Sequence, residues 1–271
     1  METTNQSAGT ALITGASSGI GEALAACFAR DGHDLVLVAR SADKLKALAA
    51  SLSAAHAVKV TVAPADLSRP GAAADLAASM KRKKIAVDVL VNCAGVLEAG
   101  AFAGMPAERH QELIDLNVSG LTAMLAHFVP PMVARGSGRI LNVASIAAFQ
   151  PVPSLATYAA TKAYVLSLTE SLSEELKGTG VTITALCPGI TATNMVSTAQ
   201  EANARLAQLP GFVIGKVEQV AEEGYQACMK GEVIKVPGVL NLAGTLASRA
   251  TPKWLMRRIT GLLGRQTMKG Q

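Results

Sequence analysis

The sequence has few aromatic residues and few charges: Phe, Trp and Tyr make up 3% of its 271 residues, and Asp, Glu, Lys and Arg 17%. Half of the residues are hydrophobic, which excludes a disordered chain and predicts a large core. Because aromatic side chains are scarce, that core has to be built mainly from Ala, Val, Leu and Ile. Such residues suit helices that pack closely on both faces of a buried parallel sheet.

Cysteine pairs and processing signals are also missing. The four cysteines form no C-x-x-C motif, and neither they nor the four histidines show metal-ligand spacing, so we predict no metal and no disulfide. The stretch from Met1 to Gly9 lacks the basic and apolar segments of a secretory signal. No uninterrupted apolar run is long enough to span a bilayer. These features predict a cytoplasmic protein.

Acidic residues are absent from position 249 onward, whereas six basic residues lie there: Arg249, Lys253, Arg257, Arg258, Arg265 and Lys269. Subtracting these six from the net charge of +5 leaves the rest of the chain at −1. The basic character therefore belongs to the C-terminal end, and we predict no nucleic-acid partner. We divide the chain into a single domain, 1–248, and a basic extension, 249–271.

Two interpretations of the extension stay open. On a helical wheel its apolar residues share one face and its arginines the opposite one, which is typical of a helix lying at a membrane surface. Gly261 and Gly264 weaken such a helix. We therefore favour an extension that docks on its own pocket or on a neighbouring subunit over a membrane partner.

Short apolar runs alternate with Ala- and Leu-rich stretches of helical length. We predict strands at 10–14, 35–39, 58–63, 87–92, 139–144, 181–187 and 232–236, and helices near 19–31, 41–54, 69–83, 107–135 and 156–178. The strands are almost continuously hydrophobic, as expected where both faces of a sheet are covered. Repeated strand–helix–strand units predict an α/β fold with a doubly wound parallel sheet.

A glycine-rich turn joins the first predicted strand to the first helix. It reads Thr14-Gly15-Ala16-Ser17-Ser18-Gly19-Ile20-Gly21. Glycines allow the backbone to approach a pyrophosphate, and the helix N-terminus offers free N–H groups and a positive dipole end. The spacing is G-x-x-x-G-x-G rather than G-x-G-x-x-G, but its position at the first strand predicts a dinucleotide cofactor.

The end of the second predicted strand indicates which dinucleotide binds. NAD-specific sites usually place an acidic residue there to bind the ribose 2′-hydroxyl. Here Ala39-Arg40 ends the strand, and Asp34 lies at its opposite end. Arg40 suits a 2′-phosphate, because a guanidinium pairs with phosphate through two hydrogen bonds. We predict NADP(H) in preference to NAD(H).

A candidate catalytic pair follows in the helix predicted at 156–178. Tyr158 and Lys162 are four residues apart and share one helix face. A cation beside a phenol favours the phenolate and lowers the tyrosine pKa, which is ordinarily about 10. Ser145 follows the strand at 139–144, and the segments 92–95 and 188–191 end its neighbours. All of them therefore meet at the carboxyl edge of the sheet.

The glycine turn, Asn92-Cys93-Ala94-Gly95, Ser145, Tyr158-Ala159-Ala160-Thr161-Lys162 and Pro188-Gly189 occur in this order, and together they resemble the short-chain dehydrogenase/reductase family. The match extends over roughly 10–236. The family more often has asparagine where this chain has Cys93, a small replacement that we regard as tolerated. The resemblance implies a Rossmann-type sheet of about seven strands and an NADP(H)-dependent oxidoreductase.

The family assigns roles to particular positions. The resemblance implies that Tyr158 is the general acid/base, that Lys162 lowers its pKa and holds the nicotinamide ribose, that Ser145 orients the substrate carbonyl, and that Asn117 supports a proton relay. It implies that the cofactor is held by Gly15, Ser17, Ser18, Gly19, Ile20, Gly21, Arg40, Asp66, Leu67, Asn92, Ala94, Gly95, Tyr158, Lys162, Pro188, Gly189, Ile190 and Thr191.

The substrate and the assembly are less specified. Loops at 96–104, 148–155 and 192–212 carry Leu97, Phe102, Phe149, Val152, Met195 and Phe212. These side chains fit either an apolar pocket for a lipid-like or aromatic carbonyl compound, or ordinary packing at the core or a subunit contact. The substrate is expected to be a small-molecule carbonyl or alcohol. An alternative function is a non-catalytic NADP(H)-binding sensor, but a sensor has no need of the four catalytic residues. Family habit implies a homodimer or homotetramer.

Overall fold

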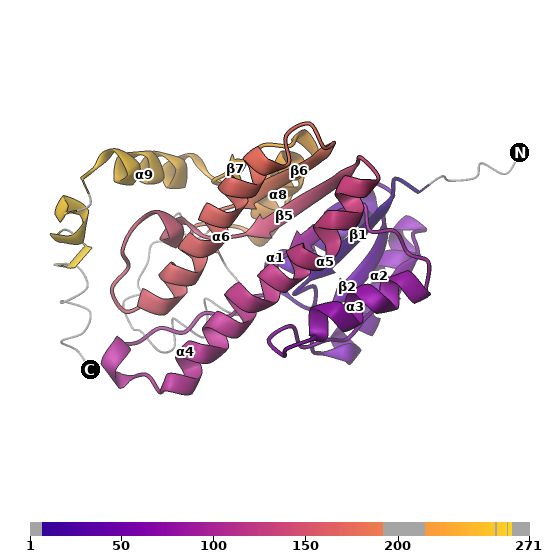
Figure 1. The fold of residues 1–271 in the computed structure, drawn as a ribbon, viewed down its shortest axis with the longest axis horizontal. Coiled ribbons are helices and arrows are strands. Elements are labelled where there is room, and N and C mark those ends of the chain that lie inside the picture. Colours follow the sequence, from indigo (N-terminus) through magenta and orange to yellow (C-terminus); the bar gives the residue numbers. More distant parts are fainter. Residues whose placement is uncertain (1–6, 192–214, 253, 259, 262–271) are drawn as a thin grey trace, which may run out of the picture.

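The computed structural model describes residues 7–191, 215–252, 254–258, 260 and 261, and it forms a three-layer α/β sandwich (Figure 1). Seven parallel strands lie in the order β3-β2-β1-β4-β5-β6-β7. Their bounds are β1 (Thr10–Thr14), β2 (Asp34–Val38), β3 (Val60–Val62), β4 (Val89–Asn92), β5 (Gly138–Val143), β6 (Val181–Leu186) and β7 (Ile234–Lys235). The predicted doubly wound parallel sheet is confirmed.

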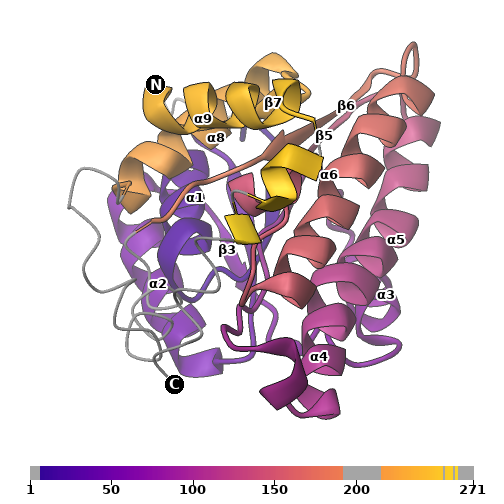
Figure 2. The same ribbon diagram turned by 90° about the vertical axis from the view of Figure 1, so that its left-hand side faces the viewer.

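Helices cover both faces of the sheet (Figure 2). One face carries α1 (Gly19–Arg30), α2 (Ala42–His56) and α8 (Val217–Lys230); the other carries α3 (Ala72–Arg82), α5 (Leu121–Ala134) and α6 (Ala156–Glu175). Each interface is a separate hydrophobic core, centred on Phe28 and Leu37 on the first face and on Met124 and Ile140 on the second. Small aliphatic residues fill most of both cores, in agreement with the scarcity of aromatic side chains.

The helix predicted at 107–135 contains an interruption. The chain forms α4 (Ala107–Ile114), a π-helical turn, η2 (Asp115–Gly120), and then α5. A π turn contains one extra residue per turn and is frequent at functional sites. Here it contains Asn117, whose side chain bonds to the loop that follows β4. That long-range contact explains why the local sequence pattern did not reveal the turn.

The stretch Ala107–Ala134 is, by length and composition alone, apolar enough to cross a membrane. It has 28 residues, and an 18-residue window within it has a mean hydropathy of 1.3. In the fold its buried side chains belong to the core on one face of the sheet: Leu121, Met124, Leu125, Phe128 and Met132. The packing of this stretch against the sheet is therefore typical of a core helix in a folded domain.

Two helices lie where no element was predicted. Helix α8 packs against α1 and the strands β5 and β6. Helix α9 (Val239–Ala250) follows β7 and contacts the short 3₁₀ helix η3 (Ile146–Phe149), which comes directly after β5. It crosses the predicted boundary between residues 248 and 249. A further helical turn at 254–258 follows it.

Candidate functional site

A cavity of about 650 Å³ opens at the carboxyl edge of the sheet. Strand β1 pairs with β2 on one side and with β4 on the other, so the strand order reverses at this point. Doubly wound sheets bind ligands in the crevice that such a reversal creates. The cavity walls come from the ends of β1, β2, β4, β5 and β6, together with α6 and η3. The topology therefore explains the position of the site.

The glycine turn lies against the backbone of two other segments. Gly15 has φ +67°, and a Cβ atom there would lie 2.9 Å from the Ala94 Cα. A Cβ atom on Gly21 would lie 2.3 Å from the Gly15 carbonyl oxygen. Ser18 is the N-cap of α1, but its side chain forms no capping hydrogen bond. The N-terminal N–H groups of α1 therefore face the cavity in a form that suits an anion such as a pyrophosphate.

Thr14 joins the glycine turn to the end of β4. Its Oγ1 accepts hydrogen bonds from the N–H groups of Cys93 and Ala94, each at 3.0 Å, and donates to the Val91 carbonyl at 3.3 Å. Thr14 is the first residue of the turn motif, but the sequence pattern does not reveal the role of its side chain. Its hydroxyl fixes two walls of the cavity relative to each other.

The end of the cavity beside β2 is positively charged. Arg40 and Lys44 both line it, and both are exposed. Asp34 lies at the far end of β2, where its carboxylate accepts from the Lys59 N–H at 2.9 Å. The predicted arginine is therefore in the cavity wall and the acidic residue is remote from it. Lys44, in the first turn of α2, was missed, because a lysine there is not distinguishable in sequence from a solvated charge.

Asp66 and Leu67 also line this end of the cavity. The Asp66 carboxylate accepts hydrogen bonds from the Ser68 hydroxyl at 2.7 Å and the Ser68 N–H at 3.1 Å. These bonds, with smaller contributions from Arg40 and Arg69, hold the pKa of Asp66 below its usual range. Asp66 is therefore a fixed carboxylate at neutral pH, which suits hydrogen bonds from an adenine amino group.

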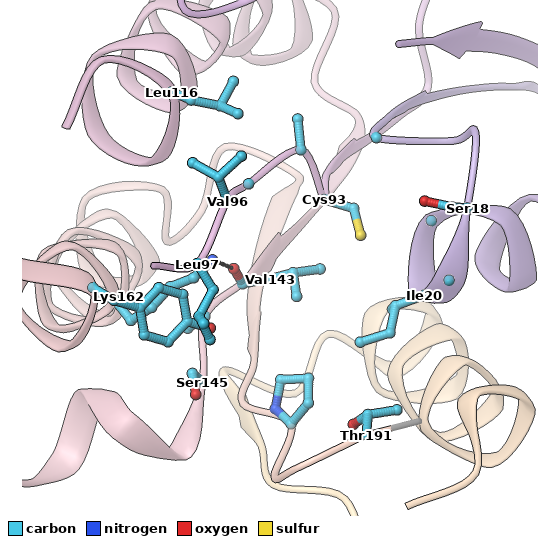
Figure 3. A pocket seen from close by; sticks show the side chains of 18 of the residues that line it. Ser18, Ile20, Cys93, Val96, Leu97, Leu116, Val143, Ser145, Lys162 and Thr191 are labelled. Atoms are coloured by element: carbon cyan, nitrogen blue, oxygen red, sulfur yellow. Dashed lines mark hydrogen bonds between the residues drawn. The ribbon is translucent and has the colours of Figure 1, made fainter. Parts of the chain in front are cut away.

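Lys162 and Ser145 lie at the opposite end of the cavity (Figure 3). Tyr158 also lines the cavity and lies beside Lys162. Tyr158 and Lys162 are buried on one face of α6, and the Lys162 Nζ lies 5.7 Å from the centroid of the Tyr158 ring. The Lys162 Nζ also donates to the Val143 carbonyl at 2.8 Å. Ser145 caps η3, and its Oγ accepts from the Ala147 N–H at 3.1 Å. The structure thus brings together three of the four predicted catalytic side chains.

Burial dominates the proton equilibria of this pair. It raises the pKa of Tyr158 to about 12, and the hydrogen bond with Ser145 offsets part of that rise. Burial also lowers the pKa of Lys162 to about 8. The Tyr158 pKa is therefore shifted in the direction opposite to the one expected from a neighbouring cation. The physical reason is that both side chains are removed from water, which disfavours phenolate and ammonium alike.

Asn117 lies behind the cavity wall rather than in it. Its Oδ1 accepts from the Val96 N–H and its Nδ2 donates to the Val96 carbonyl, both at 2.9 Å. The Nδ2 is also 3.2 Å from the Thr161 hydroxyl, which donates to the Tyr158 carbonyl at 2.7 Å. Asn117 therefore connects the cavity-lining loop after β4 to the turn of α6 that carries Tyr158.

The side chain of Asn92 is likewise outside the cavity, although the resemblance implied a cofactor-lining position. It is buried, and its Nδ2 donates to the Asn142 Oδ1 at 2.9 Å. Asn142 in turn donates to the Thr169 hydroxyl at 3.0 Å. This network connects β4, β5 and α6 inside the core. Asn92 thus positions the strands that carry the site.

The remaining predicted residues line the cavity, and apolar side chains surround the catalytic end. Gly15, Ser17, Ser18, Gly19, Ile20, Gly21, Ala94, Gly95, Pro188, Gly189, Ile190 and Thr191 are all in its wall. Leu97 and Val152 are there as predicted, with Val96, Leu116, Ile146 and Leu155 in addition. Phe102 instead lines a shallow groove with Ile114 and Val118. The predicted loop 192–212, with Met195 and Phe212, is outside the described residues.

Comparison with known proteins gives the family. Residues 9–204 match the model of the short chain dehydrogenase family. A glycine betaine reductase, ATRR, from Emericella nidulans is 34% identical over 232 residues, which are 85% of this chain. The chain spans only 18% of the length of that relative.

Solved structures of similar proteins have the same fold as this chain. A short-chain dehydrogenase from Sphingobium yanoikuyae in complex with NADPH has 34% identity and a TM-score of 0.78, over 90% of this chain and 96% of that one. A bulky-bulky ketone specific alcohol dehydrogenase from Comamonas testosteroni has 29% identity and a TM-score of 0.76, over 92% and 96%. With the sheet order, the glycine turn and the Tyr158–Lys162 pair already established, the chain belongs to the short-chain dehydrogenase/reductase family of oxidoreductases.

Proposed function

We propose that this protein is an NADP(H)-dependent oxidoreductase that interconverts a carbonyl and an alcohol, with Tyr158 as the general acid/base. The observation that carries the proposal is the cavity itself. It places a glycine turn and a helix N-terminus at one side, and the buried side chains of Tyr158, Lys162 and Ser145 at the other. A dinucleotide carries its pyrophosphate and its reactive nicotinamide in a matching order.

The residues present fit such a cofactor. Gly15 and Gly21 admit a pyrophosphate, because any side chain there would strike backbone. Arg40 and Lys44 would hold a 2′-phosphate, Asp66 the adenine and Lys162 the nicotinamide ribose. When bound, the nicotinamide supplies or accepts the hydride. The protein contributes orientation, electrostatics and the proton.

Tyr158 has the protonation state needed for carbonyl reduction. With a pKa raised to about 12, the phenol keeps its proton at neutral pH and can donate it to the oxygen of a carbonyl that is being reduced. The Ser145 hydroxyl, which interacts with the Tyr158 hydroxyl, orients that oxygen. Oxidation of an alcohol requires the phenolate, so it depends on a cation such as Lys162 acting from nearby.

The apolar lining around Tyr158 supports an apolar substrate. Leu97, Val152 and Leu155 line the cavity and pack in one cluster with Tyr158, and no described acidic side chain lines that end. An aliphatic or aromatic ketone or aldehyde gains from contact with such a surface, whereas a charged one loses its hydration. The specificity of the Comamonas relative for bulky ketones is in line with this substrate class.

The test is to follow NADPH oxidation, at the nicotinamide absorbance, with a panel of aldehydes and ketones. Tyr158→Phe preserves the ring and removes the proton donor, so kcat should fall by about 10²–10⁴-fold. NADPH affinity, measured by titration, should change little. Turnover retained in the variant would refute the role of Tyr158. Tight NADPH binding by the wild type with no turnover on the whole panel would favour the non-catalytic sensor.

A second variant tests the cofactor preference. Arg40→Ala should weaken NADPH binding by about 10- to 100-fold, since a hydrogen-bonded ion pair to a phosphate is removed. NADH binding should be nearly unchanged, because NADH lacks the 2′-phosphate. Lys46→Ala is the matched control: it removes one positive charge from the same region of α2, at a side chain that does not line the cavity. Equal losses for both cofactors would contradict the preference for NADP(H).

A further inference from the structure

Helix α9 buries polar side chains and exposes apolar ones, which is the reverse of an ordinary surface helix. The side chains that it buries are Thr245 and Ser248, with Asn241 half-buried on the same side. Its large apolar residues point outward: Val239 is 84% exposed, Leu240 69%, Leu242 44% and Leu246 57%. A helix on a soluble surface normally has the opposite arrangement.

The inward face of α9 contacts η3 and Gly189, and its polar side chains form local hydrogen bonds. Asn241 donates to the Pro237 carbonyl at 2.9 Å, and Ser248 donates to the Thr245 carbonyl at 2.9 Å. Asn241 also packs on Gly189, where a Cβ atom would come within 2.5 Å of it. The helix lies at the periphery of the molecule, beyond β7 (Figure 1). Its apolar face is therefore directed away from both cores.

The chain around and after this face is basic and has no acidic residue. From Val233 to Gln271 the sequence contains Lys235, Arg249, Lys253, Arg257, Arg258, Arg265 and Lys269, and neither Asp nor Glu. In the turn at 254–258, Trp254 is 55% exposed and Leu255 is 36% exposed. The central carbon of the Arg258 guanidinium lies 5.7 Å from the centroid of the Trp254 ring.

We propose that this surface, formed by Val239, Leu240, Leu242, Leu246 and Trp254 with the exposed Arg257 and Arg258, binds the face of an anionic membrane. Leucine and tryptophan enter the boundary between lipid headgroups and acyl chains, while arginine and lysine pair with anionic headgroups. The 12 residues of α9 are about 18 Å long, which is too short to cross a bilayer. The helix would lie in the plane of the membrane surface.

A second copy of the chain fits the same surface less well. A twofold contact places identical patches against each other, so it would bring two basic segments together with no acidic residue in 233–271 to pair with them. An anionic lipid surface supplies the opposite charge throughout. Charge complementarity therefore selects the membrane over a second subunit, and over the self-docking favoured by sequence alone.

Vesicle co-sedimentation tests the proposal on the full-length protein, without substrate or cofactor. Wild type should pellet with vesicles of phosphatidylcholine mixed with phosphatidylserine, and much less with pure phosphatidylcholine. Leu240→Glu/Leu246→Glu should reduce the partition coefficient at least about tenfold, because two apolar anchors become anionic. Ala50→Glu/Ala54→Glu, on the exposed face of α2, adds the same charge elsewhere and should have a much smaller effect.

The basic residues give an independent readout. Arg257→Gln/Arg258→Gln should lower binding to the anionic vesicles about fivefold for each charge removed, and should reduce its dependence on salt. Failure of the wild type to pellet, or equal binding by the Leu240→Glu/Leu246→Glu variant, would overturn the proposal. So would a change in oligomeric state of that variant in sedimentation velocity without lipid, since the face would then be a subunit contact. None of these outcomes depends on oxidoreductase activity.

Discussion

Helices α1 and α9 each have 12 residues, and both lie beside the cavity, but they distribute polar and apolar side chains in opposite ways. Helix α1 buries Leu24, Ala25 and Phe28 against the sheet and against α8. Helix α9 buries hydroxyl groups and presents leucines to its surroundings. The first helix is held by the protein core, whereas the second packs on Gly189 in the loop after β6 and on η3, and its side-chain hydrogen bonds are local.

The comparison shows that closeness to the site does not define a common physical role. The N-terminus of α1 forms part of the cofactor end of the cavity, so its position has to be fixed by burial to within a fraction of an ångström. Helix α9 contributes no side chain to the cavity wall. The apolar side chains on its outer face are instead explained by the membrane contact that we propose.

Truncating one large side chain on each helix should give the largest difference between them. Phe28 is fully buried and packs edge-on against His33 and Tyr225, so Phe28→Ala should lower the free energy of unfolding by about 3–5 kcal/mol. Leu246→Ala should change it by no more than about 0.5 kcal/mol, because the side chain is already exposed. Urea unfolding without lipid measures both. A loss of 2 kcal/mol or more (about the low end for buried leucine) at Leu246 would mean that another protein surface covers α9.

Substitution of Gly21, in the first turn of α1, should lower stability less than Phe28→Ala does, but it should also weaken cofactor binding. Gly21→Ala places a Cβ atom on the Gly15 carbonyl, and neither backbone can yield without moving the turn. We expect a loss of about 1–3 kcal/mol in unfolding free energy and a loss of NADPH affinity of at least about tenfold. Calorimetric titration at a temperature where the variant is folded separates the two. Unchanged NADPH affinity would contradict the assignment of this turn to the cofactor.

A glycine inside α9 provides the matched control, with the smallest expected effect. Gly244 has no atom within 4 Å of the position where a Cβ would lie. Gly244→Ala should therefore raise the free energy of unfolding by about 0.5–1 kcal/mol, because alanine restricts the unfolded chain. NADPH affinity should stay at the wild-type value. Destabilisation by this substitution would show that the outer face of α9 is closely packed against something in solution.

Much of the fold was predictable because parallel strands bury both faces and so are nearly continuous in hydrophobicity. Strand β1 was predicted to the residue, whereas β3 was predicted at 58–63 and pairs only over Val60–Val62. It is an edge strand, so pairing with one neighbour sets its length. The π turn at Asn117 was not predictable, since its side chain bonds to Val96, 21 residues earlier.

Helices α8 and α9 were missing from the sequence-based prediction for different reasons. Helix α8 has a readable stripe, with Val220, Ala221, Gly224, Tyr225 and Cys228 buried, but the adjacent acidic residues Glu222 and Glu223 obscured it. Helix α9 was not predicted at all. Its apolar residues do not by themselves show which way they point, and only the three-dimensional arrangement reveals that they point outward.

In the site, sequence motifs placed the cavity-lining residues well, because a glycine turn and the ends of parallel strands have fixed positions in this topology. They did not separate side chains in the wall from those behind it. Asn92 and Asn117 act through hydrogen bonds to Asn142 and Val96, and those partners are remote in sequence. Lys44 lines the cavity only because α2 begins directly after Arg40.

The contact between Asn241 and Gly189 has a thermodynamic consequence. Gly189 belongs to the cavity wall and Asn241 to α9, and the Asn241 side chain packs so closely on Gly189 that a Cβ atom there would lie 2.5 Å from it. Any coupling that this contact transmits between the two binding surfaces has to be reciprocal. Whatever factor a partner at α9 applies to the affinity of the cavity, a ligand in the cavity applies to the affinity of α9 for that partner.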